Sequence, residues 1–285
     1  MIKVVEVTAA SALNRSGLSE LDYTLNPYLG CLHACRYCFA VDMTPHREAR
    51  EMWGSTVAVR VNILDVLKKE IHRLRRGVVG VSTITDPYQA VEGRYRITRS
   101  CTEMLLRNGF RVSVQTKSPL VRRDVEIFSQ YRSECDVGIT ITTLSKEKSR
   151  IIEPGAPSPE SRVAALEDLS RNGISTWIFY GPIVSGFNDD SDTISGLLDV
   201  ARSTGSRIIY DRFSGYPSAV RMMRKSGFPE SSISPGEPWW NSTASIIKQA
   251  SISAGVKATA QDEEFLDLSI SHQSTLRQFG EKDKT

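Results

Sequence analysis

Three cysteines lie close together near the amino end of the chain, Cys31, Cys35 and Cys38, in the spacing C-x3-C-x2-C. Thiolates this close can converge on one metal centre, and Pro27 and Gly30 predict a loop, which makes convergence easier. A structural zinc site usually closes with four ligands. Three cysteines instead hold three corners of a [4Fe–4S] cube and leave one iron open, where a substrate or a second cofactor can bind.

Two other interpretations of these cysteines stay open at this point. His33 is a candidate fourth ligand for zinc, although its place between Cys31 and Cys35 makes a tetrahedral arrangement awkward. The three thiols can also be a chance cluster of buried structural residues. The remaining cysteines, Cys101 and Cys135, have no local partner, and we expect each to be a small buried apolar residue.

The composition is that of an ordinary globular protein. A chain of 285 residues, with 40% hydrophobic and 24% charged residues, is long enough for one large α/β domain. The net charge of +3 gives no global field that favours nucleic acid. We find no apolar run of about 18 residues and no signal-peptide pattern, so we expect no membrane span. Clustered thiols in such a chain favour a reducing, cytoplasmic location and a bound metal rather than disulfides.

The elements that must position the cysteines alternate between strand and helix. The predicted strands cover residues 21–26, 78–85, 111–116, 136–142, 174–180 and 206–211. The predicted helices cover residues 63–74, 98–108, 124–132, 159–171 and 191–202. This alternation implies parallel strands joined by right-handed crossovers. Six such units fit an open, partial (β/α)6 barrel or a doubly wound sheet, and periodicity alone does not separate the two.

The chain divides by its pattern into three parts. Residues 1–20 form a mixed lead-in, residues 21–212 form the α/β core, and residues 213–285 form a C-terminal extension that packs on it. Within the extension we expect a helix over residues 242–254 and a polar tail that frays from residue 262 onward. We find no internal repeat and no second domain.

Polar runs follow the later strands, and the cysteine loop follows the first one. In folds built on parallel strands, chemistry sits on the loops after the strands. Four runs come after strands two to five, at residues 83–89, 115–119, 140–143 and 181–189. Three of them carry hydroxyls or charges where a core residue would be apolar. The alternative is ordinary turn chemistry, because Asp-Pro, Ser-Pro and Asn-Asp are common turn pairs.

The cysteine spacing resembles the cluster motif of the radical S-adenosylmethionine (SAM) superfamily. Within it, residues 26–40 are similar to the spore photoproduct lyase-like family, often described as DNA repair photolyases. The same family shows T-D-P-Y-Q, T-K-S and E-P-x-A-P runs, which this chain has at residues 85–89, 116–118 and 153–157. A G-x-I-x-G-like segment begins at residue 181. The resemblance spans roughly residues 20 to 200 and implies the partial (β/α)6 TIM-like barrel of radical SAM enzymes.

The resemblance also implies the cofactors and the residues that hold them. Cys31, Cys35 and Cys38 would ligate a [4Fe–4S] cluster, and SAM would chelate its open iron. Four further residues are expected at the SAM site: Tyr37, Thr85, Lys117 and Thr140. Lys117 would pair with the SAM carboxylate, a charge-assisted hydrogen bond in a partly dry site. In this family an electron donor such as flavodoxin or ferredoxin reduces the cluster. SAM is then cleaved to a 5′-deoxyadenosyl radical that abstracts hydrogen from the substrate.

The substrate is the least determined part of the prediction. Spore photoproduct lyase has a cysteine and a tyrosine where this chain has Thr83 and Phe39, so the resemblance argues against thymine-dimer repair. A nucleic-acid base or nucleotide is the first candidate, by analogy with the family. Residues 94–96 mix arginine and tyrosine as nucleotide sites do, although solvated helix faces look the same. The alternatives are a peptide or small-metabolite substrate, or a non-catalytic metal-binding module that presents an interaction surface.

Overall fold

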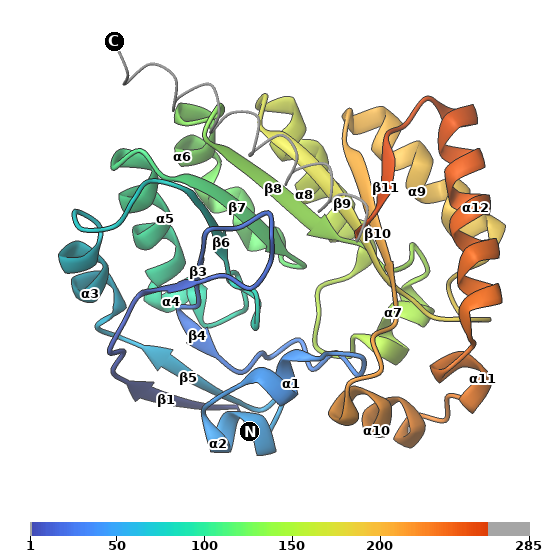
Figure 1. The fold of residues 1–285 in the computed structure, drawn as a ribbon, viewed down its shortest axis with the longest axis horizontal. Coiled ribbons are helices and arrows are strands. Elements are labelled where there is room, and N and C mark those ends of the chain that lie inside the picture. Colours follow the sequence, from blue (N-terminus) through green and yellow to red (C-terminus); the bar gives the residue numbers. More distant parts are fainter. Residues whose placement is uncertain (1, 262–285) are drawn as a thin grey trace, which may run out of the picture.

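The computed structural model describes residues 2–261, which form one large and one small sheet (Figure 1). The large sheet has eight strands in the order β11-β10-β9-β8-β7-β6-β3-β2. Their bounds are β2 (Leu13–Arg15), β3 (Tyr23–Leu25), β6 (Val78–Val81), β7 (Arg111–Thr116), β8 (Cys135–Thr140), β9 (Ser175–Ile183), β10 (Arg207–Arg212) and β11 (Ala258–Ala260). All neighbours pair in parallel except β2, which runs antiparallel to β3.

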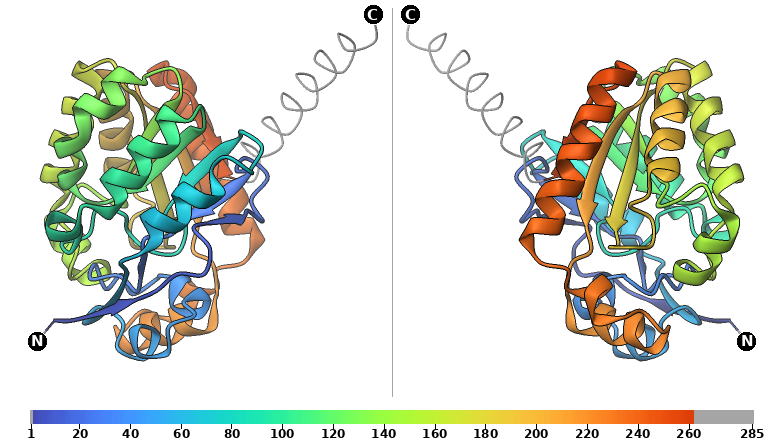
Figure 2. Two further views of the ribbon diagram at one scale, coloured as in Figure 1. Left: turned by 90° about the vertical axis from the view of Figure 1, so that its left-hand side faces the viewer. Right: turned by 90° about the vertical axis from the view of Figure 1, so that its right-hand side faces the viewer.

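The sheet is an open barrel with helices outside it. Helices join successive strands and lie together on one face of the sheet (Figure 2). They are α3 (Ile63–Glu70), α4 (Glu92–Tyr95), α5 (Ile97–Arg107), the 3-10 helix η1 (Pro119–Asp124), α6 (Val125–Gln130), α7 (Lys146–Ile152), α8 (Pro159–Arg171) and α9 (Ser191–Thr204). The core between sheet and helices buries aliphatic side chains such as Leu105, Ile139 and Leu166, whose removal from water stabilises the layers. The predicted partial (β/α)6 barrel is confirmed.

Local sequence signals set several boundaries. Strand β7 has the predicted bounds, and so does α8, where the Ser158 hydroxyl accepts a hydrogen bond from Ser161 N at 3.4 Å and Pro159 follows at the first helical position. Strand β6 ends at Val81 rather than at residue 85, because Ser82 adopts a φ of +65° and turns the chain. The polar run that follows is therefore a turn at the end of the strand.

The small sheet holds the start of the cysteine loop. Its order is β1 (Lys3–Val7), β5 (Thr56–Arg60), β4 (Tyr28–Leu29), and β4 pairs antiparallel with β5. Strand β5 lies in a stretch with a weak sequence pattern, because four of its five residues are buried and no alternation marks it. Gly30 follows β4 with a φ of +86°, and a Cβ there would lie 2.7 Å from the Thr56 carbonyl oxygen. A side chain at position 30 would push the loop off this sheet.

Residues 213–261 reach both the barrel and the cysteine loop. Helix α12 (Glu237–Ala254) packs on α9, and β11 extends the large sheet next to β10. Helices α1 (Ala40–Met43) and α2 (Arg47–Glu51) follow the cysteine loop, and α10 (Pro217–Lys225) and α11 (Glu230–Ile233) lie beside it (Figure 1). The Asp42 carboxylate accepts hydrogen bonds from the backbone N–H and hydroxyl of Ser218, at 3.0 and 2.6 Å.

The division of the chain at residues 20 and 212 stays a prediction. The predicted polar tail lies in residues 262–285, outside the described residues. Among residues 2–261, no helix combines the length and the apolar character needed to cross a bilayer.

Candidate active site

A cavity of about 1010 Å³ runs along the inner face of the barrel. Its lining includes all seven residues predicted to hold the cluster and SAM: Cys31, Tyr37, Cys35, Cys38, Thr85, Lys117 and Thr140. They come from the cysteine loop after β3 and from the carboxyl ends of β6, β7 and β8, which meet at one edge because the strands are parallel. The fold thus brings together residues that are far apart in the sequence.

The three loop cysteines are free thiols in a dry setting. Cys31 and Cys35 are buried and Cys38 is half-buried. Burial raises the pKa of all three thiols, to about 12 for Cys35, and Lys117 partly opposes this rise at Cys35 and Cys38. A coordinated metal deprotonates such a thiol outright. The donor set therefore fits a metal centre better than a free reactive cysteine.

The described side chains bear on which kind of metal centre the loop could hold. Among residues 2–261, no three His, Cys, Asp or Glu side chains converge as one metal ion requires. Thiolates on a [4Fe–4S] cube bind different irons, so a cluster does not need them to converge on one point. His33 Nδ1 lies 3.3 Å from Asp86 Oδ2 in a buried pair, which orients the ring and leaves Nε2 as the nitrogen that could bind a metal. The zinc alternative therefore stays open.

Asp86 organises the turn after β6. Its carboxylate accepts hydrogen bonds from Thr116 Oγ1 at 2.7 Å, from Lys117 N at 2.8 Å and from Tyr88 N at 2.9 Å. Burial raises the pKa of Asp86, but His33 and these donors outweigh burial and lower it to about 2. An ionised Asp86 therefore ties the polar turn after β6 to the end of β7 and to the cysteine loop.

Thr85 holds the cysteine loop in place through hydrogen bonds. Its hydroxyl donates to the Gly30 carbonyl at 2.6 Å and accepts from Gln89 Nε2 at 2.9 Å. The Gln89 side-chain oxygen in turn accepts from Leu32 N at 3.0 Å. Because the Thr85 proton is already committed, a contact of Thr85 with SAM would have to use the remaining lone pair of its oxygen.

Lys117 belongs to a buried ionic group that we call the Glu153 network, made of Tyr37, Lys117, Glu153 and Arg162. Arg162 Nη2 lies 2.6 Å from Glu153 Oε2, the Tyr37 hydroxyl donates to Glu153 Oε1, and Lys117 Nζ is 4.0 Å from that oxygen. Burial raises the pKa of Glu153, but Arg162 and Lys117 outweigh it and lower the pKa. Burial lowers the pKa of Lys117, but Cys35 and Glu153 raise it overall. Lys117 is thus a cation that faces the cavity.

Thr140 closes the same corner of the cavity. Its hydroxyl accepts a hydrogen bond from Gln115 Nε2 at 3.1 Å, and its carbonyl accepts from Arg162 Nη1 at 3.2 Å. The loop after α7 then passes behind the cysteines. Gly155 N donates to the His33 carbonyl at 3.0 Å, and a Cβ at position 155 would collide with the Leu32 carbonyl oxygen. Glycine is needed there because two backbones touch.

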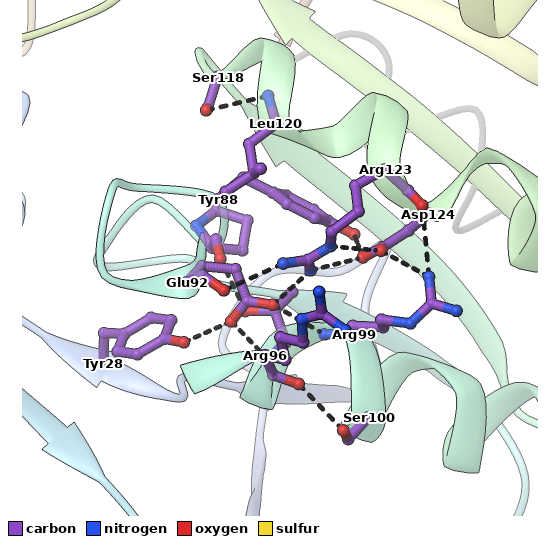
Figure 3. Close-up of polar contacts among 12 residues, drawn as sticks. Tyr28, Tyr88, Glu92, Arg96, Arg99, Ser100, Ser118, Leu120, Arg123 and Asp124 are labelled. Carbon is purple, nitrogen blue, oxygen red and sulfur yellow. Dashed lines mark hydrogen bonds and ion pairs between the residues drawn. The ribbon is translucent and has the colours of Figure 1, made fainter. Parts of the chain in front are cut away.

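A second buried group, which we call the Glu92 network, lies outside the cavity lining (Figure 3). Its members are Tyr28, Tyr88, Glu92, Arg99, Arg123 and Asp124. Arg123 Nη2 lies 2.7 Å from Glu92 Oε1, and the Arg123 Nε lies 2.8 Å from Asp124 Oδ1. Tyr28 donates to Glu92, and Tyr88 donates to Asp124 at 2.9 Å. Since Tyr88 stands two residues after Asp86 in the polar turn, this network fixes that turn from the outer side.

Sequence reasoning missed several of these residues, and the roles of the seven predicted ones stay predictions. Glu153 lies in a run that was noted only as a motif, and Arg162 looks like an ordinary helix residue. Their signal is weak because a buried arginine is recognised only once its partner is in place. Residues 94–96 do not line the cavity, and Tyr95 donates to Glu6 at 2.9 Å, which favours the interpretation as a solvated face.

Fold and site together define an enzyme built on a partial barrel, with a thiol loop and a cation at the mouth. A family model for the radical SAM superfamily matches residues 25–195, and the chain belongs to this superfamily. Its members use a [4Fe–4S] cluster and SAM. An uncharacterized protein of Methanocaldococcus jannaschii is 32% identical over 188 residues, which is 66% of this chain and 70% of that protein.

Two further comparisons report a more distant relative and a solved structure. A radical SAM Nα-GlyT isomerase of Pseudomonas phage M6 is 23% identical over 219 residues, 72% of this chain and 43% of the phage protein. A crystal structure of spore photoproduct lyase complexed with a dinucleoside spore photoproduct has a TM-score of 0.67 at 14% identity, covering 90% of this chain and 81% of that chain. Another structure of that lyase holds bound AdoMet as well. At this identity the likeness of the structures shows a shared fold.

Proposed function

We propose that the cavity is the active site of a radical SAM enzyme in which Cys31, Cys35 and Cys38 hold the cluster. The observation that carries the proposal is that these three thiols line one cavity together with the cation of Lys117. When bound together, the cluster and SAM supply a 5′-deoxyadenosyl radical that takes a hydrogen atom from the substrate. Cys31 and Cys35 are buried, which limits their contact with water.

The side chains around the cysteines have distinct roles in this proposal. Lys117 pairs with the SAM carboxylate, because it is protonated and its nearest carboxylate oxygen in the described residues is 4.0 Å away. Tyr37 lies beside SAM and is held by Glu153. Thr140 presents its strand-end hydroxyl to the cavity, and Thr85 holds the carbonyl of the loop in place.

A nucleic-acid base or nucleotide is the proposed substrate. Phe39 and Tyr216 line the cavity with their ring centroids 5.6 Å apart, and they are 39% and 37% exposed. Exposed aromatic faces form platforms on which bases stack. The lyase structure was solved with a dinucleoside spore photoproduct, and the phage protein is named an Nα-GlyT isomerase. A cavity of about 1010 Å³ also has room for SAM and a second ligand.

The reaction we propose is hydrogen abstraction by a lyase or modifying enzyme, and not the repair of a thymine dimer. Thr83 and Phe39, which stand where the resemblance places a thiol and a phenol, both line the cavity. An aliphatic O–H bond is a poor hydrogen-atom donor, and phenylalanine has no labile hydrogen. Cys101 is buried in the core on α5, outside the cavity lining. We further propose a flavodoxin- or ferredoxin-type electron donor and a cytoplasmic location, which the five free thiols support.

The test is anaerobic reconstitution with iron and sulfide, followed by reduction with dithionite in the presence of SAM. We expect about four irons per chain and release of 5′-deoxyadenosine. Cys35→Ala should abolish both, whereas Cys101→Ala, a cysteine outside the cavity, should retain both. Iron content and nucleoside release that survive Cys35→Ala would contradict the proposal and favour a non-catalytic module.

The substrate class has its own test. We expect single-stranded oligonucleotides to bind the reconstituted enzyme with an affinity that falls as salt rises. Tyr216→Ala should weaken this binding about 5- to 150-fold, because stacking on an aromatic ring is worth roughly 1–3 kcal/mol per base. Tyr131→Ala, at a partly buried position packed against the core on the helix side, is the control. Oligonucleotide binding that is absent, or insensitive to Tyr216, would instead favour a peptide or small metabolite.

A further inference from the structure

The cysteine loop has a second, outward side. Arg36 stands between Cys35 and Cys38 in sequence, but it is not among the residues that line the cavity. Its side chain lines a separate open pocket at the surface, together with Lys146, Glu147, Arg150, Ile151 and Ser226. We call this surface the Arg36 pocket. Its lining residues come from the cysteine loop, from α7 and from Ser226 just after α10. The ribbons of α7 and α10 both lie beside the loop (Figure 1).

The lining of the Arg36 pocket carries a net positive charge. Three of its lining residues are cations and one, Glu147, is an anion. Within the described residues, none of the three cations has a carboxylate at ion-pair distance, whereas Lys148 on the same helix lies 2.7 Å from Asp190. The exposed Glu160 carboxylate lies near enough to Lys146 and Arg150 for them to help lower its pKa, after the hydrogen bond from Ser158.

Two further details show that groups of the pocket lack a partner: an unpaired donor and an exposed apolar side chain. The Arg36 Nε is buried and has no hydrogen-bond partner in the described structure, while its Nη1 donates to the Ser226 hydroxyl. Ile151 is 41% exposed in the middle of the charged residues. A cationic rim around an exposed apolar side chain is the composition of a transient protein interface.

We propose that the Arg36 pocket is the docking surface for an acidic one-electron donor protein. This inference rests on the proposed function, because only a redox cluster behind the loop needs an electron from outside. The donor loses one electron and the cluster gains it, which supplies the reducing equivalent for cleavage of SAM. Arg36 is the residue next to Cys35 in the chain, so a partner seated here contacts the cysteine loop itself.

The position of the pocket favours a protein over nucleic acid. A nucleic-acid substrate must reach the cavity, whose lining is made of strand ends and the inner side of the loop. The Arg36 pocket shares no lining residue with the cavity. An acidic protein that delivers only an electron does not need to reach the cavity, and complementary charge increases its rate of encounter.

The experiment compares two reductants on one variant. Lys146→Glu/Arg150→Glu reverses the two α7 cations that line the pocket and leaves the cysteine loop unchanged. With a reduced acidic flavodoxin as donor, we expect 5′-deoxyadenosine release at low donor concentration to fall at least tenfold. With dithionite, we expect release at the wild-type rate. Direct binding of the flavodoxin to the reconstituted protein, measured by calorimetry, should weaken by the same factor and should be lost at high salt in the wild type.

Lys69→Glu/Arg73→Glu, near the carboxyl end of α3, is the matched control and should leave both rates and the binding unchanged. Unaltered flavodoxin binding and unaltered flavodoxin-driven release in the Lys146→Glu/Arg150→Glu variant would overturn the docking proposal. An equal loss with dithionite and with flavodoxin would overturn it too, because the change would then act on the site itself. If the wild type releases no 5′-deoxyadenosine with dithionite, the proposed function fails, and the binding measurement still decides on docking.

Discussion

The Glu153 and Glu92 networks contain the same types of residue, but only the Glu153 network has a side chain that faces the cavity. Each centres on a buried carboxylate that meets a tyrosine hydroxyl and an arginine, Arg162 in one case and Arg123 in the other. The Glu153 network opens on the cavity through Lys117. The Glu92 network is closed between β4, α4, α5 and η1 (Figure 3).

The charge balance follows this difference. In the Glu92 network, the carboxylates of Glu92 and Asp124 face the guanidinium groups of Arg99 and Arg123, so the buried charges are matched. In the Glu153 network, one carboxylate faces two cations. A matched network can only stabilise the fold, whereas a surplus cation beside a cavity is available to an anionic ligand. Four predictions test this contrast.

The largest effect is expected from Arg123→Met. Loss of this arginine leaves Glu92 and Asp124, which are almost fully buried, short of a partner, and breaking a buried ion pair costs about 3–5 kcal/mol. Urea unfolding of the apoprotein measures the loss. Arg122→Met, one residue away on η1, is the control: its partner Asp168 is near the surface, and we expect a change below about 1 kcal/mol. If Arg123→Met and Arg122→Met lowered the unfolding free energy equally, the buried network would be no more important for stability than the surface pair.

Lys117→Met should leave the fold intact and weaken the site. We expect the dissociation constant for SAM, measured on the reconstituted enzyme, to rise about 10- to 100-fold, as for loss of a charge-assisted hydrogen bond. The urea midpoint should change little, since Lys117 lies 4.0 Å from its carboxylate partner. Lys148→Met, a lysine paired with Asp190 at the surface, should leave SAM affinity unchanged. If the variant loses stability but keeps its affinity for SAM, the Glu153 network serves only to stabilise the fold, as the Glu92 network does.

Asp86, which joins the two networks through Tyr88 and Lys117, should give a pH signature. Its pKa is lowered from 3.8 to about 2, so it stabilises the fold above pH 3.8 and this contribution is lost as the pH falls toward 2. The contribution is on the order of 2 kcal/mol. Asp86→Asn should therefore flatten the fall of unfolding free energy between these pH values, and Asp65→Asn, at an exposed position, should not. If the unfolding free energy of Asp86→Asn fell with pH as steeply as that of the wild type, Asp86 would not be the ionised group that connects the two networks.

The smallest effect is expected at the outer edge of the Glu92 network. Glu126 is 63% exposed and lies 2.5 Å from Arg99 Nη2. Because water and salt screen such a pair, Glu126→Gln should cost less than about 1 kcal/mol, and added salt should shrink the difference further. A cost comparable to that of Arg123→Met would show that the network extends to the surface and is not confined to its buried members.

The sequence was informative where chemistry and periodicity are local. The thiol spacing, the polar turn after β6 and Lys117 after β7 are short runs, and each ends up at the cavity. Helix α8 was predicted to the residue because a serine cap and a proline mark its start. The open barrel followed from alternation combined with the family resemblance, since alternation alone also fits a doubly wound sheet.

The rest depends on long-range pairing that no local pattern encodes. Strand β5 is buried throughout most of its length and lacks alternation, so the small sheet went unpredicted. The pairing of Glu153 with Arg162, and the packing of α10 against Cys35 and Tyr37, exist only after the barrel has curved. The Arg36 pocket joins residues from the cysteine loop, α7 and the end of α10, and a sequence window cannot show that they meet.

The contact between Gly155 and the backbone of Leu32 and His33 sets an order of events during synthesis. The three thiols leave the ribosome early, but the segment that backs their loop is translated long afterwards, and Ser218, which anchors Asp42, later still. A nascent chain thus exposes these three cysteines well before the segments that shield them are made. Premature oxidation of the thiols is the hazard to which the growing polypeptide is subject.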